Sequence, residues 1–147
     1  MAYYVGHDIE TDDAGEVQFE NGDIKLASTK RTFLQGLNWM IMSSRTESSV
    51  PDAMAHLVVY KGRLNVANVH RSIETSIRQA ALYQNLFDPN DLDVRVVPIA
   101  TDAASLTVKL KGVFLEDRLE DQDDPVISYQ TLGYVFPFES ATPERVV

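Results

Sequence analysis

The side chains that we consider first for catalysis are four glutamates: Glu10, Glu47, Glu74 and Glu116. Glycoside hydrolysis needs two carboxylates about 5–9.5 Å apart, one of them in an apolar pocket that raises its pKa. None of the four lies in an apolar run of the sequence, and Glu74 falls on the predicted surface of a helix. Their surroundings predict that the chain is not an enzyme.

Histidine, serine and cysteine offer no stronger chemistry. The histidines, His7, His56 and His70, lack the i, i+4 or His-x-His spacing of a metal site. The serines between 43 and 49 lack a Gly-x-Ser-x-Gly elbow, and the absence of cysteine excludes thiolate ligands and disulfides. We expect no metal and no cofactor, and we expect His70 to be a partly buried polar residue beside a helix stripe.

Composition predicts one soluble domain over residues 1–147, because 44% of the residues are hydrophobic and 24% are charged. The net charge of −9 opposes contact with phosphate backbones, and no stripe of lysine or arginine compensates, so we expect no nucleic acid. The first residues do not resemble a signal peptide, and no apolar run reaches the roughly 20 residues of a membrane helix. We expect synthesis in a reducing cytoplasm and no contact with membranes.

A β-hairpin is predicted over residues 16–27. Asn21 and Gly22 tolerate the positive φ angles that a two-residue type I′ turn requires. That turn predicts two cross-strand pairs that put four apolar side chains on one face: Phe19 with Ile24, and Val17 with Leu26.

Helical periodicity predicts an amphipathic helix over 29–43, a short helix over 51–57 and a long helix over 66–86 with Asn65 as its N-cap. Trp39 lies off the main apolar stripe of the first helix. It either broadens the buried face or contacts a partner.

Alternating apolar residues predict strands over 92–99, 105–114 and 126–138, and Pro98 ends the first of these or places it at a sheet edge. The acidic run 116–124 predicts a solvated tether before the last strand. The expected fold is α+β: a small antiparallel or mixed sheet with an N-terminal hairpin, two to three helices on one face, and the C-terminal strand at or near a sheet edge.

The segment 126–138 is rich in β-branched and aromatic residues and has two interpretations. It is the third strand of the domain's own sheet, or it is an edge offered to a partner strand, and both hold if it is the outermost strand. The candidate partner-binding residues are Val126, Ile127, Tyr129, Thr131, Tyr134, Phe136, Phe138 and Trp39.

Several local sequences, taken in order, make the chain resemble the sheath-initiator family of contractile phage tails, also called lysozyme-like baseplate wedge proteins. The matching pieces are Asp8-Ile-Glu10, Asn21-Gly-Asp-Ile24, Phe33-Leu-Gln-Gly-Leu37, Val50 to Leu57, Gly62 to Asn65, and Leu92 to Pro98 with its lysine-bearing partner strand. They span roughly residues 8–115. The chain departs from the family at its Glu-Pro-Arg motif, because Arg45-Thr-Glu47 stands in that region and the nearest proline is Pro51.

The resemblance implies a structural virion protein of the tail baseplate, made in the cytoplasm of the host bacterium. It implies copies arranged in a sixfold ring around the tail tube, anchored on baseplate wedge proteins, with strands that the first ring of tail sheath protein joins. The departure at the Glu-Pro-Arg motif leaves its wedge-docking role without an assigned residue here. The alternatives are a small tail-associated peptidoglycan hydrolase and a generic α+β adaptor.

We expect the purified protein to leave a suspension of bacterial cell walls turbid, because its glutamates lack the pocket that a glycosidase acid needs. Robust clearing that is lost in a Glu47→Gln variant would show that the chain is a hydrolase.

Overall fold

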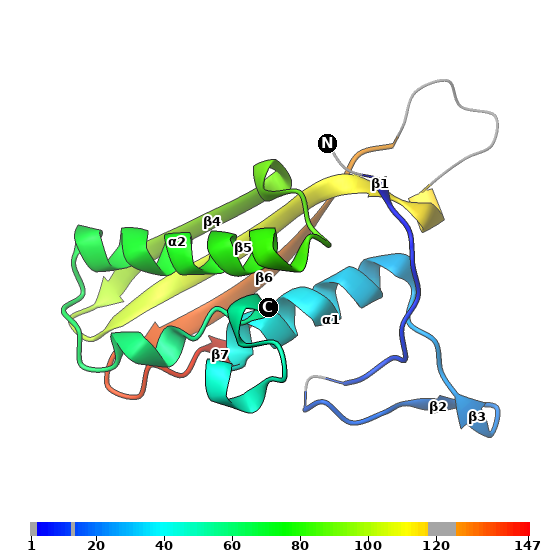
Figure 1. Cartoon of the computed structure of the whole chain (residues 1–147), viewed down its shortest axis with the longest axis horizontal. Helices are drawn as coiled ribbons and strands as arrows, with labels where there is room; N and C mark the ends of the chain where they lie inside the picture. The colour runs from blue at the N-terminus through cyan, green and yellow to red at the C-terminus, as the bar shows by residue number, and fades with distance from the viewer. Residues whose placement is uncertain (1–2, 13, 118–125) are drawn as a thin grey trace.

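The computed structural model describes residues 3–12, 14–117 and 126–147 of the chain. These residues form two α-helices, a mixed five-stranded sheet and a separate two-stranded hairpin, which confirms the predicted α+β class (Figure 1). None of the described helices is both long enough and apolar enough to cross a membrane.

The helices and strands follow in this order: β1 (Tyr3–Tyr4), β2 (Phe19–Glu20), β3 (Asp23–Ile24), α1 (Thr29–Met42), α2 (Ala67–Gln84), β4 (Leu92–Ala100), β5 (Ala103–Phe114), β6 (Ser128–Pro137) and β7 (Glu144–Arg145). Short 3-10 turns lie between them: η1 (Arg45–Glu47), η2 (Pro51–Ala53), η3 (Leu57–Tyr60), η4 (Pro89–Asp91) and η5 (Leu115–Asp117). The prediction of one short helix over 51–57 is wrong. Met54 is extended and His56 is left-handed, so the segment divides into η2 and η3.

β5 is the central strand of the sheet. It pairs antiparallel with β4 and with β6, and its end at Val113 and Phe114 pairs in parallel with β1. Its sequence suits this place because Leu106, Val108 and Leu110 alternate with polar residues, so one face of the strand is apolar. β6 then pairs at its far end with β7.

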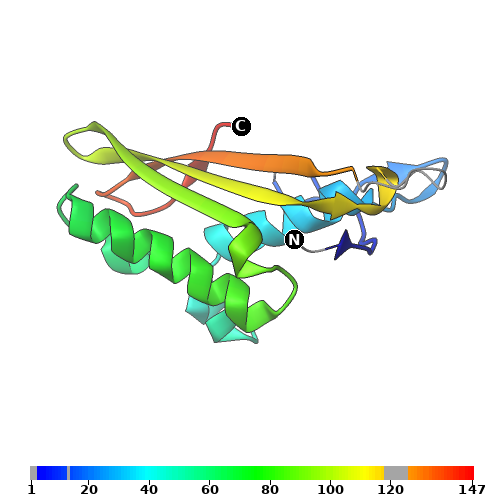
Figure 2. The same ribbon diagram turned by 90° about the horizontal axis from the view of Figure 1, so that it is seen from above.

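Both helices cover the same face of the sheet, and the opposite face has no helix over it (Figure 2). The core lies between these layers, where α1 contributes Leu37 and Met40, and α2 contributes Ile73 and Ile77, all fully buried. The sheet side of the core consists of alternate strand residues, among them Val94, Leu106, Val108, Leu110, Leu132, Tyr134 and Phe136. His70 is also buried, beside Phe138.

Asn65 does not cap α2 as predicted. Val66 is the N-cap residue and makes no side-chain capping bond. The Asn65 amide instead donates to the carbonyls of Ala100, at 2.7 Å, and Ala103, at 2.9 Å, and its oxygen contacts the ring of His70. The prediction failed because the Asn65 side chain bonds to residues distant in the sequence, and these bonds join the start of α2 to the β4–β5 turn.

The predicted hairpin turn is confirmed. Asn21 and Gly22 have φ angles of 53° and 79°, and Phe19 lies opposite Ile24. In place of the expected pair of Val17 with Leu26, each residue bridges to the segment 9–11, which runs beside both strands. Ile9 bridges to Leu26, and Thr11 bridges to Val17.

Truncation of Leu106 to alanine should lower the free energy of unfolding by about 3 kcal/mol, since the side chain is fully buried in the central strand and its loss leaves a cavity. Leu82→Ala is the matched control, because Leu82 is exposed on α2 and its truncation should change stability by less than about 0.5 kcal/mol. Urea unfolding followed by circular dichroism measures both. Equal losses would contradict the layered core.

Candidate functional site

The outer edge of β6 is the part of the sheet that remains open. In an antiparallel sheet the backbone groups of successive residues point alternately to the two neighbouring strands. Gly133 bonds outward, since its N–H donates to the Val147 carbonyl at 3.3 Å and its own carbonyl accepts from Val146 at 2.9 Å. Tyr129 and Thr131, four and two residues earlier, therefore also point their N–H and C=O groups outward. Within the described ranges no strand pairs with them on that side.

Side chains of α2 cover part of the opposite edge of the sheet, at β4. The Glu74 carboxylate accepts from the Val96 N–H at 3.2 Å, and Arg78 donates to the Leu92 carbonyl at 2.7 Å. Pro98, at a register shift near the end of β4, has no N–H to offer. An incoming strand would meet helix side chains and a proline at β4, whereas at Tyr129 and Thr131 of β6 it would meet backbone groups with which no described strand pairs.

The structure divides the candidate partner-binding residues into two groups. Tyr134, Phe136 and Phe138 are buried in the domain core, so they belong to the interior of the fold. The others are exposed to solvent: Val126, Ile127, Tyr129, Thr131 and Trp39. The division follows from strand alternation, because even-numbered residues of β6 face the helices and odd-numbered residues face away from them.

The uncovered sheet face beside the open edge is polar and basic. Lys109 on β5 is exposed, and its ammonium lies 5.9 Å from the centre of the Tyr129 ring, a cation–π geometry. The Tyr129 side chain is 57% exposed. A strand added to β6 would therefore lie next to an aromatic ring that a lysine already holds in place.

The start of β6 is held by the residues that flank the acidic run. Lys30, in the first turn of α1, lies 2.8 Å from an Asp117 carboxylate oxygen, and the other oxygen of that carboxylate accepts from the Ser128 hydroxyl. The Glu116 carboxylate accepts from the backbone N–H of Lys30 at 2.9 Å. These bonds keep the pKa of Asp117 below its usual value, chiefly through Lys30 and then through Ser128. The rest of the predicted tether, 118–124, lies outside the described residues.

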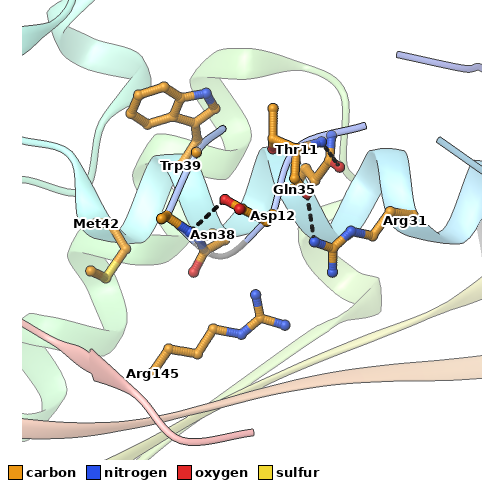
Figure 3. Close-up of a pocket in the computed structure, with 10 residues that line it drawn as sticks. Thr11, Asp12, Arg31, Gln35, Asn38, Trp39, Met42 and Arg145 are labelled. Atoms are coloured by element: carbon orange, nitrogen blue, oxygen red, sulfur yellow. Dashed lines mark hydrogen bonds between the residues drawn. The ribbon is translucent and has the colours of Figure 1, made fainter. Parts of the chain in front are cut away.

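A pocket of about 230 Å³ lies between α1, the loop around Thr11 and Asp12, and β7 (Figure 3). Gln35 of α1 accepts from the Thr11 N–H at 2.9 Å, and Arg31 donates to the Thr11 carbonyl at 2.7 Å, so the loop is fixed to the helix. Arg145 reaches into the space between the sheet edge and α1. This pocket adjoins the end of the β6 edge that β7 occupies.

Two apolar surfaces are exposed to solvent, and the sequence identified them only in part: it placed the four hairpin residues on one face and named Trp39 as a candidate partner contact. The hairpin surface consists of Val17, Phe19, Ile24 and Leu26, all of which are exposed. The helix-end groove, about 590 Å³, lies between the ends of α1 and α2, and its large apolar lining residues are Trp39, Val50, Met54, Tyr83 and Leu86. The side chain of Trp39 is 68% exposed, so this residue does not broaden the buried face of α1. The weak signal in the sequence was the placement of Trp39 and Tyr83 off the buried stripes.

Three of the four glutamates considered first for catalysis make structural contacts. Glu10 pairs with Lys25 at 2.9 Å, Glu74 accepts from Val96, and Glu116 accepts from Lys30. The histidines are likewise separate: His7 bonds to the Ala27 carbonyl, His56 accepts from the Arg45 N–H, and His70 contacts Asn65. No group of three or more histidine and acidic side chains suited to a metal ion occurs among the described residues.

Asp117→Asn should lower the free energy of unfolding by about 1 kcal/mol at pH 7, because it weakens a partly exposed charge-assisted bond. Since the pKa of Asp117 is lowered in the folded protein, its stabilisation is complete above the ordinary value of 3.8 and disappears as pH falls through the lowered value. Urea unfolding of both proteins at several pH values should show the difference shrinking below that value. A difference independent of pH would contradict this role.

Comparison with known proteins gives no family assignment. No protein-family model matches the sequence. Neither the curated proteins nor the solved structures contain a match to the chain.

Proposed function

We propose that this chain is a non-enzymatic structural protein of a contractile phage tail baseplate, where it connects the wedge to the first ring of sheath and initiates sheath assembly. The observation that carries the proposal is that no described strand pairs with the outer edge of β6 at Tyr129 and Thr131, whereas Glu74 and Arg78 of α2 bond to the outer edge of β4. An exposed strand edge is a template for a strand of another protein.

The ordered local sequences that resemble the sheath-initiator family supply the identity of the partners. In this proposal the tail sheath protein pairs with β6, while baseplate wedge proteins and the tail tube contact other surfaces. The hairpin surface and the helix-end groove support this arrangement, since a ring component must contact neighbours on more than one side. Exposed aromatic residues such as Phe19 and Trp39 are typical of the centres of protein interfaces.

The apolar and aromatic side chains of β6 have a supporting role in this proposal. Tyr134 and Phe136 anchor the strand in the core, and the Tyr134 hydroxyl donates to the Asn38 side chain at 2.7 Å. A rigidly held strand loses little conformational freedom when a partner pairs with it. Affinity would then come from backbone hydrogen bonds at the edge and from apolar burial at the other surfaces, without a cofactor.

Thr131→Pro should reduce nucleation of sheath by about tenfold or more, because proline removes an N–H that points away from β5 and obstructs an incoming strand. Thr131→Val keeps the N–H and is the matched control, which should nucleate as the wild type does. Light scattering with purified sheath protein of the same virion measures nucleation, and thermal unfolding confirms that both variants fold. Equal nucleation by the two variants would show that this edge is not the template.

Electron microscopy of tails carrying a labelled copy of this protein should place it at the junction of sheath and baseplate, in six copies as the resemblance implies. A position elsewhere in the virion, or absence from it, would overturn the proposal.

A further inference from the structure

Residues 144–147 pair with the outer edge of β6 at Gly133 and Val135, beyond the open positions Tyr129 and Thr131. Glu144 lies opposite Val135, and the Gly133 carbonyl accepts from both Val146, at 2.9 Å, and Val147, at 3.3 Å. Two residues therefore oppose one, which is the arrangement of a β-bulge. The segment is a short and irregular edge strand, unlike β5, which pairs with β6 along nearly its whole length.

The side chains of this segment bury little surface. Val146 and Val147 are 63% and 71% exposed, and Glu144 is exposed as well. The segment is held mainly by backbone bonds to Gly133 and Val135 that face solvent. Elements with few buried apolar contacts open locally at low cost compared with global unfolding.

Arg145 marks where a side chain of any strand paired with β6 would point. It lies opposite Tyr134, whose side chain is buried on the helix-covered face, so Arg145 also projects to that side. There it enters the pocket beside α1 that Asp12, Gln35 and Asn38 also line (Figure 3). This pocket holds a long cationic side chain, although Arg31 also lines it and the Asp12 carboxylate already accepts from the backbone N–H groups of Ala14 and Glu16.

Gly133 shows where a strand paired with β6 would place a side chain on the uncovered face of the sheet. A Cβ atom placed on Gly133 would lie 3.4 Å from the Cβ of Val147, in ordinary van der Waals contact. The valine thus fills the space that the glycine leaves on its own strand. A β-branched residue suits this place because it packs against a pleated surface.

We propose that residues 144–147 hold the place of a partner strand and are displaced by it. The partner is an extended segment that pairs first with Tyr129 and Thr131 and then replaces residues 144–147 opposite Gly133 and Val135. It inserts a long cationic side chain where Arg145 lies and sets a β-branched residue over Gly133. This inference rests on the proposed function, in which the segment belongs to the sheath protein.

A cysteine pair that locks the segment in place tests the displacement. The chain has no cysteine, so Val135→Cys with Glu144→Cys introduces one defined pair. The two residues are opposite one another on adjacent strands, where the Cα separation of about 5.5 Å suits a disulfide. The oxidised variant should bind purified sheath protein of the same virion at least about tenfold more weakly than the wild type, and dithiothreitol should restore binding.

The matched control is Arg95→Cys with Thr107→Cys, which joins β4 to β5 at an opposed pair that does not have to separate. Its oxidised form should bind sheath protein as the wild type does. Val146→Pro removes a backbone donor to Gly133 and should speed binding, because it loosens the segment without shortening the chain.

The outcomes separate this inference from the proposed function. If the wild type does not bind sheath protein, the proposed function and the inference that rests on it both fail. If the wild type and the oxidised Val135–Glu144 variant bind equally well, residues 144–147 are not displaced and only this inference fails.

Discussion

The pairing of backbone groups in the sheet is the constraint on which the rest of this structure depends. Each strand residue directs one N–H and one C=O to the left or to the right, and a buried group needs a partner there. β5 satisfies this requirement on both sides through β4 and β6. At the outer side of β4 the partners come from Glu74 and Arg78, two side chains of α2. At the outer side of β6, residues 144–147 supply partners at Gly133 and Val135, and within the described ranges no strand pairs with Tyr129 and Thr131.

This asymmetry follows from the placement of the helices. α2 packs along β4, where its polar side chains reach the strand edge, whereas α1 lies under β6 and presents Asn38 to the buried Tyr134 hydroxyl. α1 consequently supports the helix-covered face of β6, while no described strand pairs with its outer edge at Tyr129 and Thr131. Bonds from Asp117 to Lys30 and Ser128 fix the start of the same strand. The result is a rigid template whose free groups are already aligned.

An open strand edge is a hazard because it can pair with other chains. The chain limits this hazard in two ways. The edge is short, because residues 144–147 take the positions at Gly133 and Val135, and charged residues such as Lys109 lie on the adjoining face. The net charge of −9 also opposes association between copies.

Features that depend on neighbours in the chain were determined by the sequence alone. The Asn21-Gly22 turn, the boundaries of α1 and the strands β4 to β6 agree with prediction, because turn chemistry and hydrophobic period act within a few residues. Features that depend on distant residues were decided by the tertiary structure. Asn65 binds the β4–β5 turn instead of capping a helix, and Trp39 is exposed. Which sheet edge stays open depends on where α2 packs, and no local pattern encodes that position, since it results from the burial of all the apolar faces together.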